Sequence, residues 1–334
     1  NPFPSFMESN IPSVPRFSSV KTLLNGLFDY AGLFPPASLS LGAAFEEYVG
    51  HRSGPDAWMM GPFVLPVGML NEMSHLVLNT PEQAPFDFDV LPRASATIES
   101  LEESLKEDLE SCARFVQGLE GRARIDMFEI RFPPQTFTDA SQAVKVVAKV
   151  SEIFEASEFN SASVFGEIIR ASSFDQEVPL FFLALASSPF KQKIWGKIRC
   201  GGMGADDFPT PSQLAQFIHT AIHIPFPFKA TAGLHHPIRH VISSQNVVMH
   251  GFLNVLFATS LGRTHQLGIA EIAAILEDQN PDSFVFSPSG IHWKDLFASN
   301  TDFIRDRRNL SLSIGSCSLN EPRADLLHLG WLSK

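Results

Sequence analysis

The sequence predicts an α/β protein, a single (β/α)8 barrel of the TIM type with an N-terminal arm. Short apolar stretches alternate with helical stretches of about 10 to 15 residues, which is typical of βαβ units and a parallel sheet. Eight candidate strands can be counted, as a barrel of this type requires. No G-x-G-x-x-G turn follows the first strand, which disfavours an open dinucleotide-binding sheet.

We expect the Pro-rich arm to span residues 1–19 and the barrel domain residues 20–334. The arm holds four Pro and no long apolar stretch, so it does not resemble a secretory signal. A helix over 20–28 should end at the run DYAGLFPP at 29–36, whose Gly and Pro break regular structure.

The candidate strands are short apolar segments at 58–67, 94–98, 125–131, 163–168, 195–200, 226–232, 283–286 and 310–314. The helices expected between them share an apolar stripe or a start signal and lie at 101–119, 140–156, 212–222, 251–261 and 269–276. Asp139 with Gln142, and Thr210 with Pro211 and Gln213, are N-terminal capping signals for two of these helices.

Composition excludes several classes of protein. Of the 334 residues, 44% are hydrophobic and 30 are Phe, which excludes a disordered chain. The 36 acidic residues outnumber the 25 Lys and Arg, giving a net charge of −11, so we expect no nucleic-acid partner. No apolar run reaches the length of a membrane span. Three Cys without paired spacing favour the cytoplasm or another reducing soluble compartment, and a homo-oligomer is compatible with the sequence.

Strand parity places ionisable side chains on one face of four consecutive strands. Alternate residues of a strand share a face, and helices should cover the outer face of the barrel with apolar contacts. The residues of opposite parity should then point inward: Glu129, Arg131, Glu167, Lys197, Arg199 and Lys229. Such groups are costly to bury unless they are paired or bind a ligand. Two readings stay open, a polar site at the carboxyl-terminal mouth and a set of structural salt bridges.

The segment FKATAGLHHP at 228–237 is the most informative for chemistry. A cation nearby, Lys197 or Arg199, could lower the pKa of Lys229 and free its amine for Schiff-base formation. His235 or His236 could then transfer protons. Alternatively, Lys229 pairs with Glu167, and the two His only cap the loop. We expect no metal or other cofactor, because adjacent His side chains diverge and no ligand motif is present.

Several groups are candidates for binding a small anion. Gly201 and Gly202, which follow a strand, could present backbone N–H groups, and Arg199 could add a bidentate contact. Ser316 follows the last candidate strand, where barrel enzymes commonly bind phosphate. Arg131 and His236 complete this set. Two neighbours of these segments have competing readings: Cys317 is a nucleophile or a buried thiol, and Asp29 either reaches the mouth or caps its turn, with the turn favoured.

Two strand motifs resemble those of class I aldolases of the deoxyribose-phosphate aldolase type, KIRCGG at 197–202 and KATAG at 229–233. In that family a K-T-S-T-G strand supplies the Schiff-base Lys, and a neighbouring K-A-S-G-G strand supplies a second Lys that depresses its pKa. The resemblance implies these two roles for Lys229 and Lys197. It covers about 40 residues, and the motif order differs, since the G-G strand comes first here.

A second resemblance runs almost from end to end. The motifs DYAGLFPPA at 29–37, KIRCGG, FKATAGLHHP, HGFLN at 250–254 and GSCSLNEP at 315–322 are similar to those of a bacterial protein family with no assigned reaction. That resemblance implies membership of the family but indicates nothing about the reaction.

Together these observations predict a cofactor-independent lyase or aldolase acting on a small anionic carbonyl compound. Lys229 would form the Schiff base or act as general base, Lys197 would tune it, and Glu167 and His235 would move protons. The alternatives are a phosphoribosyl or other anionic-group transferase that binds phosphates with Lys and Arg, and a non-catalytic barrel subunit of a larger assembly.

Overall fold

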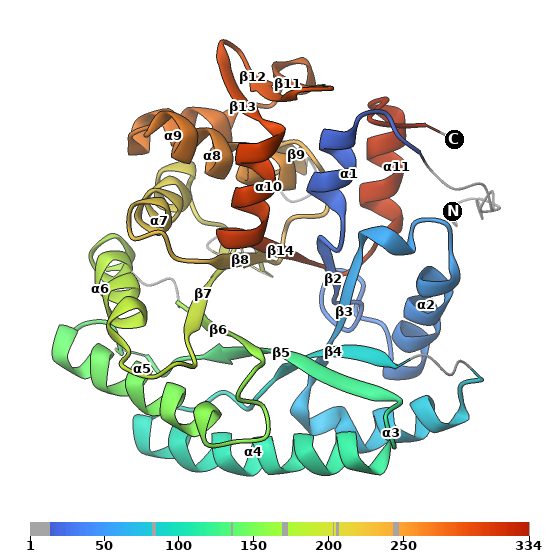
Figure 1. Cartoon of the computed structure of the whole chain (residues 1–334), viewed down its shortest axis with the longest axis vertical. Helices are drawn as coiled ribbons and strands as arrows, with labels where there is room; N and C mark the ends of the chain where they lie inside the picture. Colours follow the sequence, from blue (N-terminus) through green and yellow to red (C-terminus); the bar gives the residue numbers. More distant parts are fainter. Residues whose placement is uncertain are drawn as a thin grey trace.

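The computed structural model describes residues 14–333 except 82–84, 135, 169–172, 203, 205, 206 and 243–246. Eight parallel strands close into a barrel in the order β14-β2-β3-β4-β5-β6-β7-β8. Every neighbouring pair in this ring is parallel, including β14 with both β2 and β8. The (β/α)8 barrel predicted from the sequence is confirmed, with the strands at the centre of Figure 1 and helices around them.

The barrel strands are β2 (Phe28–Tyr30), β3 (Met60–Pro66), β4 (Phe86–Leu91), β5 (Ala123–Arg131), β6 (Ser163–Glu167), β7 (Ile194–Arg199), β8 (Phe228–Thr231) and β14 (Ser311–Ser316). The helices are α1 (Ser18–Leu24), α2 (Leu41–Ser53), α3 (Leu70–Asn79), α4 (Ile98–Gly118), α5 (Ala140–Glu155), α6 (Phe174–Ser187), α7 (Pro211–His223), α8 (Phe252–His265), α9 (Ile269–Glu277), α10 (Asn300–Asn309) and α11 (Asn320–His328). Short 3-10 turns lie at Ala57–Met59, Val67–Met69 and Pro281–Ser283.

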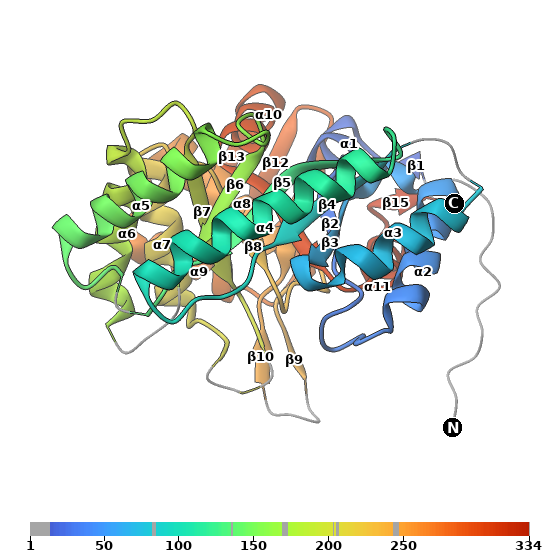
Figure 2. The ribbon, with the colours of Figure 1, turned by 90° about the horizontal axis from the view of Figure 1, so that it is seen from below.

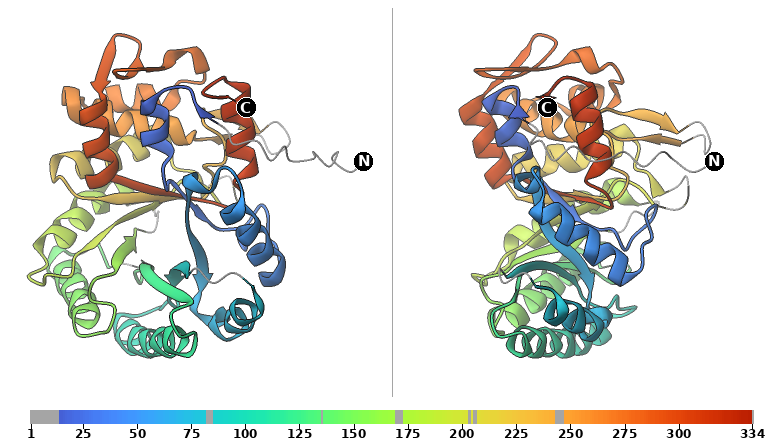
Figure 3. Two further views of the ribbon diagram at one scale, coloured as in Figure 1. Left: turned by 45° about the vertical axis from the view of Figure 1, so that its right-hand side comes forward. Right: turned by 90° about the vertical axis from the view of Figure 1, so that its right-hand side faces the viewer.

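Two additions interrupt the simple repeat between β8 and β14. An antiparallel hairpin of β9 (His240–Ile242) and β10 (Val247–Met249) projects from the body of the molecule, as Figure 2 shows. A three-stranded antiparallel sheet of β11 (Phe284–Ser287), β12 (Gly290–Trp293) and β13 (Leu296–Ser299) lies at the outer edge (Figure 3). Helices α8 and α9 lie between these additions in sequence.

The two ends of the described part of the chain pair in a small sheet. Strand β1 (Val14–Pro15) pairs antiparallel with β15 (Leu332–Ser333), and α1 begins at Ser18. The last residues of the expected arm therefore join the fold, while residues 1–13 lie outside the described part. Among the described residues, no helix has the length and apolar character needed to cross a membrane.

Two barrel strands differ from the sequence prediction. The prediction of a strand at 94–98 is wrong: residues 92–97 form no strand, and the third barrel strand is β4, which lies earlier in the chain. The first barrel strand is β2, which covers the last residue of the helix expected at 20–28 and the start of the run expected to end that helix. The strand expected at 283–286 exists but belongs to the outer sheet. Because β2 and β4 each turn an Asp inward, their hydrophobic signal is weak.

Phe side chains on the outer face of the strands pack under the helices. The Phe128 ring meets those of Phe154 and Phe159 at centroid distances of 5.1 Å, and Phe228 meets Phe217 at 5.4 Å. All five are buried, and edge-to-face pairs of this kind add to the apolar burial. The parity expected from the sequence, with Phe outside and charge inside, therefore holds for these strands. Phe165 is the exception, since it shares the inward face with Glu167.

The capping signals read from the sequence are confirmed in part. Thr210 and Gln213 form a reciprocal capping box with Pro211 at the first position of α7. Asp139 accepts a hydrogen bond from the backbone N–H of Gln142 at the start of α5, but Gln142 does not return it.

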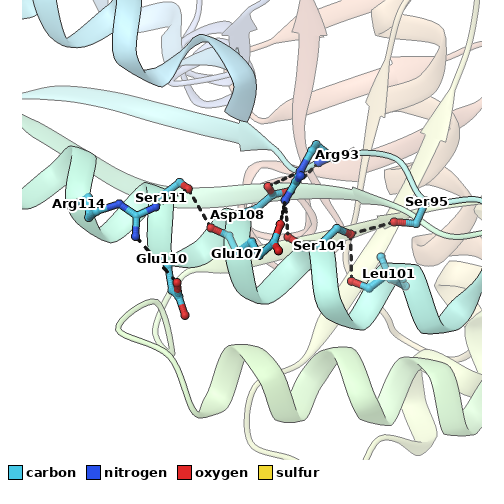
Figure 4. A network of polar contacts seen from close by, with 9 residues as sticks. All are labelled: Arg93, Ser95, Leu101, Ser104, Glu107, Asp108, Glu110, Ser111 and Arg114. Atoms are coloured by element: carbon cyan, nitrogen blue, oxygen red, sulfur yellow. Dashed lines mark hydrogen bonds and ion pairs between the residues drawn. The ribbon is translucent and has the colours of Figure 1, made fainter.

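A polar network holds the chain after β4 against α4 (Figure 4). The backbone N–H and the Nε of Arg93 donate to the two carboxylate oxygens of Asp108, at 2.8 and 2.7 Å. A second guanidinium nitrogen donates to Glu107 at 2.7 Å. Asp108 is only 3% exposed, so its two hydrogen bonds are shielded from water. This pairing fixes the segment that leaves the carboxyl end of β4.

We expect Asp108→Ala to lower the free energy of unfolding by about 1–3 kcal/mol, because the Arg93 backbone N–H loses a charged acceptor. Denaturant unfolding followed by circular dichroism measures the change. Glu110→Ala is the control: that side chain is 73% exposed and only 3.9 Å from Arg114, so the change should stay below about 0.5 kcal/mol. Equal effects of the two substitutions would contradict the anchoring role of Asp108.

Candidate active site

Lys229 lies at the centre of the barrel interior among three carboxylates. Its Nζ is 2.7 Å from Asp29 Oδ2 on β2, 2.7 Å from Asp89 Oδ2 on β4 and 2.5 Å from Glu129 Oε1 on β5. The side chain has no exposed surface. An ammonium withdrawn from water in this way is stable only when its donors meet acceptors. Lys229 donates hydrogen bonds to Asp29 and Asp89, and Glu129 adds an ion pair.

Lys197, the neighbour of Lys229 in the register of β7 and β8, lies between two glutamates. Its Nζ forms ion pairs with Glu129 Oε2 and, at 2.6 Å, with Glu167 Oε2. Glu129 thus bridges the two lysines. Arg131, at the end of β5, reaches Glu167 at 3.8 Å. The inward parity of these side chains is confirmed, and they form one connected network.

Smaller neighbours complete the surroundings of Lys229. The Ser313 hydroxyl on β14 donates to Asp29 Oδ2 at 2.5 Å. The Met127 sulfur lies 3.4 Å from Lys229 Nζ, and the face of the Phe165 ring lies 5.3 Å from it. Gly61 leaves the room that Asp29 occupies, since a Cβ there would be 2.2 Å from Asp29 Oδ1. These contacts leave little freedom around the ammonium.

The pKa shifts follow from burial and these partners. Burial alone would lower the pKa of Lys229, but Asp29, Asp89 and Glu129 outweigh it and raise that pKa well above its usual value. Burial likewise opposes the charge of Glu129, yet Lys197 and Lys229 hold the pKa of this carboxyl below its usual range. For Asp89, burial and then Glu129 raise the pKa well above normal. Lys229 is therefore an ammonium and Glu129 a carboxylate.

The lowered pKa expected for Lys229 is wrong. That expectation depends only on the cations of the neighbouring strand, whereas three carboxylates from strands distant in sequence surround the amine. The alternative pairing of Lys229 with Glu167 is also wrong, because Glu167 pairs with Lys197. The broader reading, a set of interior ion pairs, describes Lys229 correctly.

Sequence reasoning missed two central carboxylates. The sequence favours a turn role for Asp29, but its side chain is 1% exposed and binds Lys229. Asp89, which is fully buried, has no role in the sequence prediction. A signal for Asp89 exists in the alternation Phe-Asp-Phe-Asp at 86–89, which puts the two Phe on one face of a strand and the two Asp on the other.

The network becomes more exposed toward the carboxyl ends of the strands. The Lys229 side chain has no exposed surface, Lys197 is 7% exposed and Arg131 is 51% exposed. Arg199, which ends β7 and has the same parity as Lys197, is also exposed. No ion-pair partner of Arg199 is found within the described residues. The end of the barrel therefore presents two guanidinium groups above a buried ionic core.

The backbone after β7 passes close to the loop after β8. A Cβ at Gly201 would be 2.9 Å from the Cα of Gly233, whose φ of +68° also favours glycine. The Gly202 side is occupied by a carboxylate, because a Cβ there would meet Asp207 Oδ2 at 2.4 Å. Asp207 accepts from the Gly204 N–H at 2.8 Å. The Asp207 carboxylate thus already occupies this turn, which disfavours the binding of a substrate anion at Gly201 and Gly202.

His235 lies apart from the two lysines and faces Cys317. The Cys317 sulfur is 3.5 Å from His235 Nδ1, and Glu321 lies 4.0 Å from the same nitrogen. Burial, with His236 and His240 nearby, lowers the pKa of His235 to about 4. Burial raises the pKa of the Cys317 thiol to about 11. At neutral pH the pair is uncharged, which is the opposite of an activated nucleophile.

His236 points away from its neighbour and lines a separate cavity of about 220 Å³. Its Nδ1 is 2.5 Å from Asp325 Oδ2 on α11, and its ring meets that of His240 at 4.3 Å. The side chains of the two adjacent His therefore lie in different surroundings, as expected for neighbouring residues whose side chains point in different directions. Neither has a contact with Lys197 or Lys229 among the described residues.

Ser316 is committed to its own turn. It is 2% exposed, and its hydroxyl donates to the Ser318 carbonyl at 2.7 Å.

A second cavity, of about 430 Å³, lies beside α4 and is lined by Arg93, Glu107 and Arg114 among others. No group of three or more His, Cys, Asp or Glu suited to a metal ion occurs among the described residues.

Comparisons with protein-family models, with curated proteins and with solved structures find no match for this chain. The two resemblances read from the sequence motifs therefore stay predictions. What can be inferred about chemistry depends on the geometry of the barrel interior and its carboxyl end.

We expect Glu129→Gln to lower the free energy of unfolding by about 3–5 kcal/mol, because it removes a carboxylate shared by two buried ammonium groups. Asp126→Asn on the same strand is the control, since that side chain is 77% exposed. The effect should depend on pH. Because folding lowers the pKa of Glu129, its stabilisation is full above its unfolded pKa of about 4.3 and declines as pH falls below that value.

Unfolding free energies of wild type and Glu129→Gln at pH 7 and at lower pH measure this. The difference between them should shrink on acidification. A Glu129→Gln protein as stable as wild type at pH 7 would contradict the bridging role.

We expect native protein at pH 7 to react slowly with a thiol reagent at all three cysteines. Each is buried, and burial raises the pKa of Cys112 and Cys200 to about 12 and that of Cys317 to about 11. Labelling with iodoacetamide, located by peptide mass, measures this, and denatured protein supplies the control. Fast labelling of Cys317 alone would restore it as a nucleophile.

Proposed function

We propose that this chain is a cofactor-independent lyase of the aldolase type, acting on a small anionic carbonyl compound at the carboxyl end of the barrel. One observation supports this proposal above the others. Lys197 lies between two carboxylates at the edge of the buried network, and the guanidinium groups of Arg131 and Arg199 lie at the exposed end of the same face. An amine, a proton acceptor and anion-binding groups are thus near one another.

The proposal gives the two lysines roles opposite to those expected from the sequence. Lys229 has no exposed surface and three carboxylate partners, so it serves to hold Glu129 and Asp29 in place. Lys197 is slightly exposed and is the amine that meets the carbonyl carbon. Its pKa is raised by Glu129 and Glu167 against the effect of burial, so a base must take its proton before it can react. Glu167, 2.6 Å away, is that base.

The covalent step balances with these groups alone. Glu167 relays two protons from the Lys197 ammonium to the carbonyl oxygen, which leaves as water, and a carbon–nitrogen double bond forms. Glu167 then takes the proton of the β-hydroxyl, and the bond between the α- and β-carbons breaks to release one carbonyl product. The electron pair of that bond forms an enamine. Glu167 returns the proton to the α-carbon, and one water hydrolyses the iminium to free Lys197.

Arg131 and Arg199 define the class of substrate. A guanidinium binds a carboxylate or a phosphate with two parallel hydrogen bonds. Arg131 also lies 3.8 Å from Glu167, so a substrate anion held there would place its carbonyl group near the acid–base residue. Holding reactants in this way is itself a large part of catalysis.

A non-catalytic barrel is the second candidate, favoured by the closed ion pairs of Lys229. Buried ion pairs are weak evidence for stability, and a purely structural network has no need of Arg199, which is exposed and has no ion-pair partner in the described part of the chain. A transferase that only binds phosphates would use the same two arginines without a covalent step. Trapping experiments separate the three.

We expect borohydride reduction to trap small carbonyl compounds that carry a phosphate or carboxylate on Lys197. Intact mass shows the adduct, and peptide mapping locates it. Lys197→Arg should abolish the adduct, whereas Lys149→Arg, on the exposed face of α5, should not change it. Arg199→Ala should lower trapping of anionic carbonyls about tenfold, as expected for the loss of a charge-assisted contact, and leave neutral carbonyls unaffected.

An adduct on Lys229 would restore the roles expected from the sequence. No adduct with any compound would overturn the lyase. If no adduct forms but inorganic phosphate stabilises the native protein against unfolding, the transferase is favoured. If neither the carbonyl compounds nor phosphate has an effect, the non-catalytic barrel is favoured.

A further inference from the structure

The barrel interior holds more negative than positive groups. The buried members, each no more than 6% exposed, are the carboxyls of Asp29, Asp89, Glu129 and Glu167 and the ammonium groups of Lys197 and Lys229. Arg131 lies beside Glu167 and Arg307 lies in the field of Asp29, both at the periphery of this set. Three carboxyls, those of Asp29, Asp89 and Glu129, share the Lys229 ammonium. If all three were ionised, negative charge would exceed positive charge around this buried ammonium, which is strongly unfavourable.

Two carboxyl groups of this set meet at one ammonium. Asp89 Oδ2 and Glu129 Oε1 lie 2.7 and 2.5 Å from the same Lys229 Nζ, and neither carboxyl can donate to the other unless one of them carries a proton. Among the described residues, Asp29 Oδ1, Asp89 Oδ1 and Glu129 Oε1 are buried without a hydrogen-bond partner. Glu129 Oε1 lies 2.5 Å from Lys229 Nζ as an ion pair but outside hydrogen-bond geometry.

We propose that Asp89 and Glu129 share one proton at neutral pH, carried mainly by Asp89, and that this proton makes Asp89 the positioning residue for Glu129 and Lys197. The proton removes the excess charge and supplies the donor that both oxygens lack. This inference does not depend on the reaction proposed above.

The neighbours of each aspartate decide which one carries the proton. Asp29 Oδ2 accepts from two donors, Lys229 and the Ser313 hydroxyl, and hydrogen bonds to the charged form favour it. Burial still raises the pKa of Asp29 against these donors, but it raises the pKa of Asp89 well above its usual value. Within the described part of the chain, Asp89 accepts from Lys229 alone. The strand on the other side of Asp89 contributes Val64 in register, which provides no donor. The charged groups facing Asp89 are thus Lys229, Asp29 and Glu129, and the raised pKa of Asp89 agrees with this environment.

The shared proton affects the position of Lys197 through Glu129. One oxygen of Glu129 faces Asp89 and Lys229, and the other binds Lys197. With Asp89 neutral, Glu129 can approach it and still bridge both lysines. With Asp89 ionised, the two carboxylates would repel each other, and Glu129 would lose the position from which it holds Lys197 between itself and Glu167.

Infrared spectroscopy tests the proton directly. At pH 7, where exposed carboxyls are ionised, we expect wild-type protein to show one band of a protonated carboxyl group. Asp89→Asn should abolish the band and leave the fold intact, because an amide reproduces the acceptor toward Lys229 and the donor toward Glu129. Asp306→Asn is the matched control: Asp306 is equally buried but accepts from Arg263, Arg305 and Ser260, so the band should persist.

The pH dependence of stability is an independent readout. Because folding raises the pKa of Asp89, wild type takes up a proton on folding above the unfolded pKa of about 3.9, and stability falls as pH rises toward the folded pKa. The unfolding constant of wild type relative to Asp89→Asn should therefore rise about tenfold per pH unit between about pH 5 and pH 7, where the unfolded Asp is ionised and the folded Asp89 still carries its proton.

Any of four results would overturn the proposal. Three of them are the absence of a protonated-carboxyl band in wild type at pH 7, a band that persists in Asp89→Asn, and failure of Asp89→Asn to fold. A pH-independent ratio of the two unfolding constants would equally show that Asp89 is ionised in the folded state.

Discussion

The buried ammonium of Lys229 is the constraint on which the rest of the barrel interior depends. A charge without exposed surface must be compensated within hydrogen-bond distance, and three different strands supply the partners, Asp29, Asp89 and Glu129. A buried carboxylate also needs a partner, so Glu129 pairs with Lys197, and Lys197 in turn pairs with Glu167. Each charged side chain compensates the charge of its neighbour, and the ion pairs link six strands of the barrel, β2, β4, β5, β6, β7 and β8.

This ionic interior accounts for the apolar exterior of the strands. Because the inward positions are occupied by charged groups, the hydrophobic burial that stabilises the domain lies mainly between strands and helices. Phe128 and Phe228 pack there against helical Phe side chains. The high Phe content of the chain suits this arrangement. In other barrels, apolar side chains inside the barrel also contribute to the core. Here the large Phe rings between strands and helices supply that burial.

Exposure and chemistry change together along the network. At the closed end, Lys229 is fixed by partners that suit its charged form. At the open end, Lys197 keeps a slight exposure, Glu167 touches it, and Arg131 and Arg199 reach solvent. A group can react only where a substrate can reach it. The ion pairs of the buried Lys229 therefore have a structural role, whereas Lys197 and Glu167, nearer the open end of the barrel, are the candidates for catalysis.

Local patterns in the sequence determined the βα repeat, the barrel and the inward parity of the charges on β5 to β8, because alternation and helical periodicity are properties of neighbouring residues. They did not reveal β2 or β4, whose inward Asp residues interrupt the apolar signal. Nor could they reveal the partners of Lys229, since Asp29 lies 200 positions and Asp89 140 positions away in the chain. Only closure of the barrel brings those strands opposite Lys229. The tertiary structure therefore decided the charge of this lysine, because a pKa depends on every group within a few ångströms, whatever its place in the sequence.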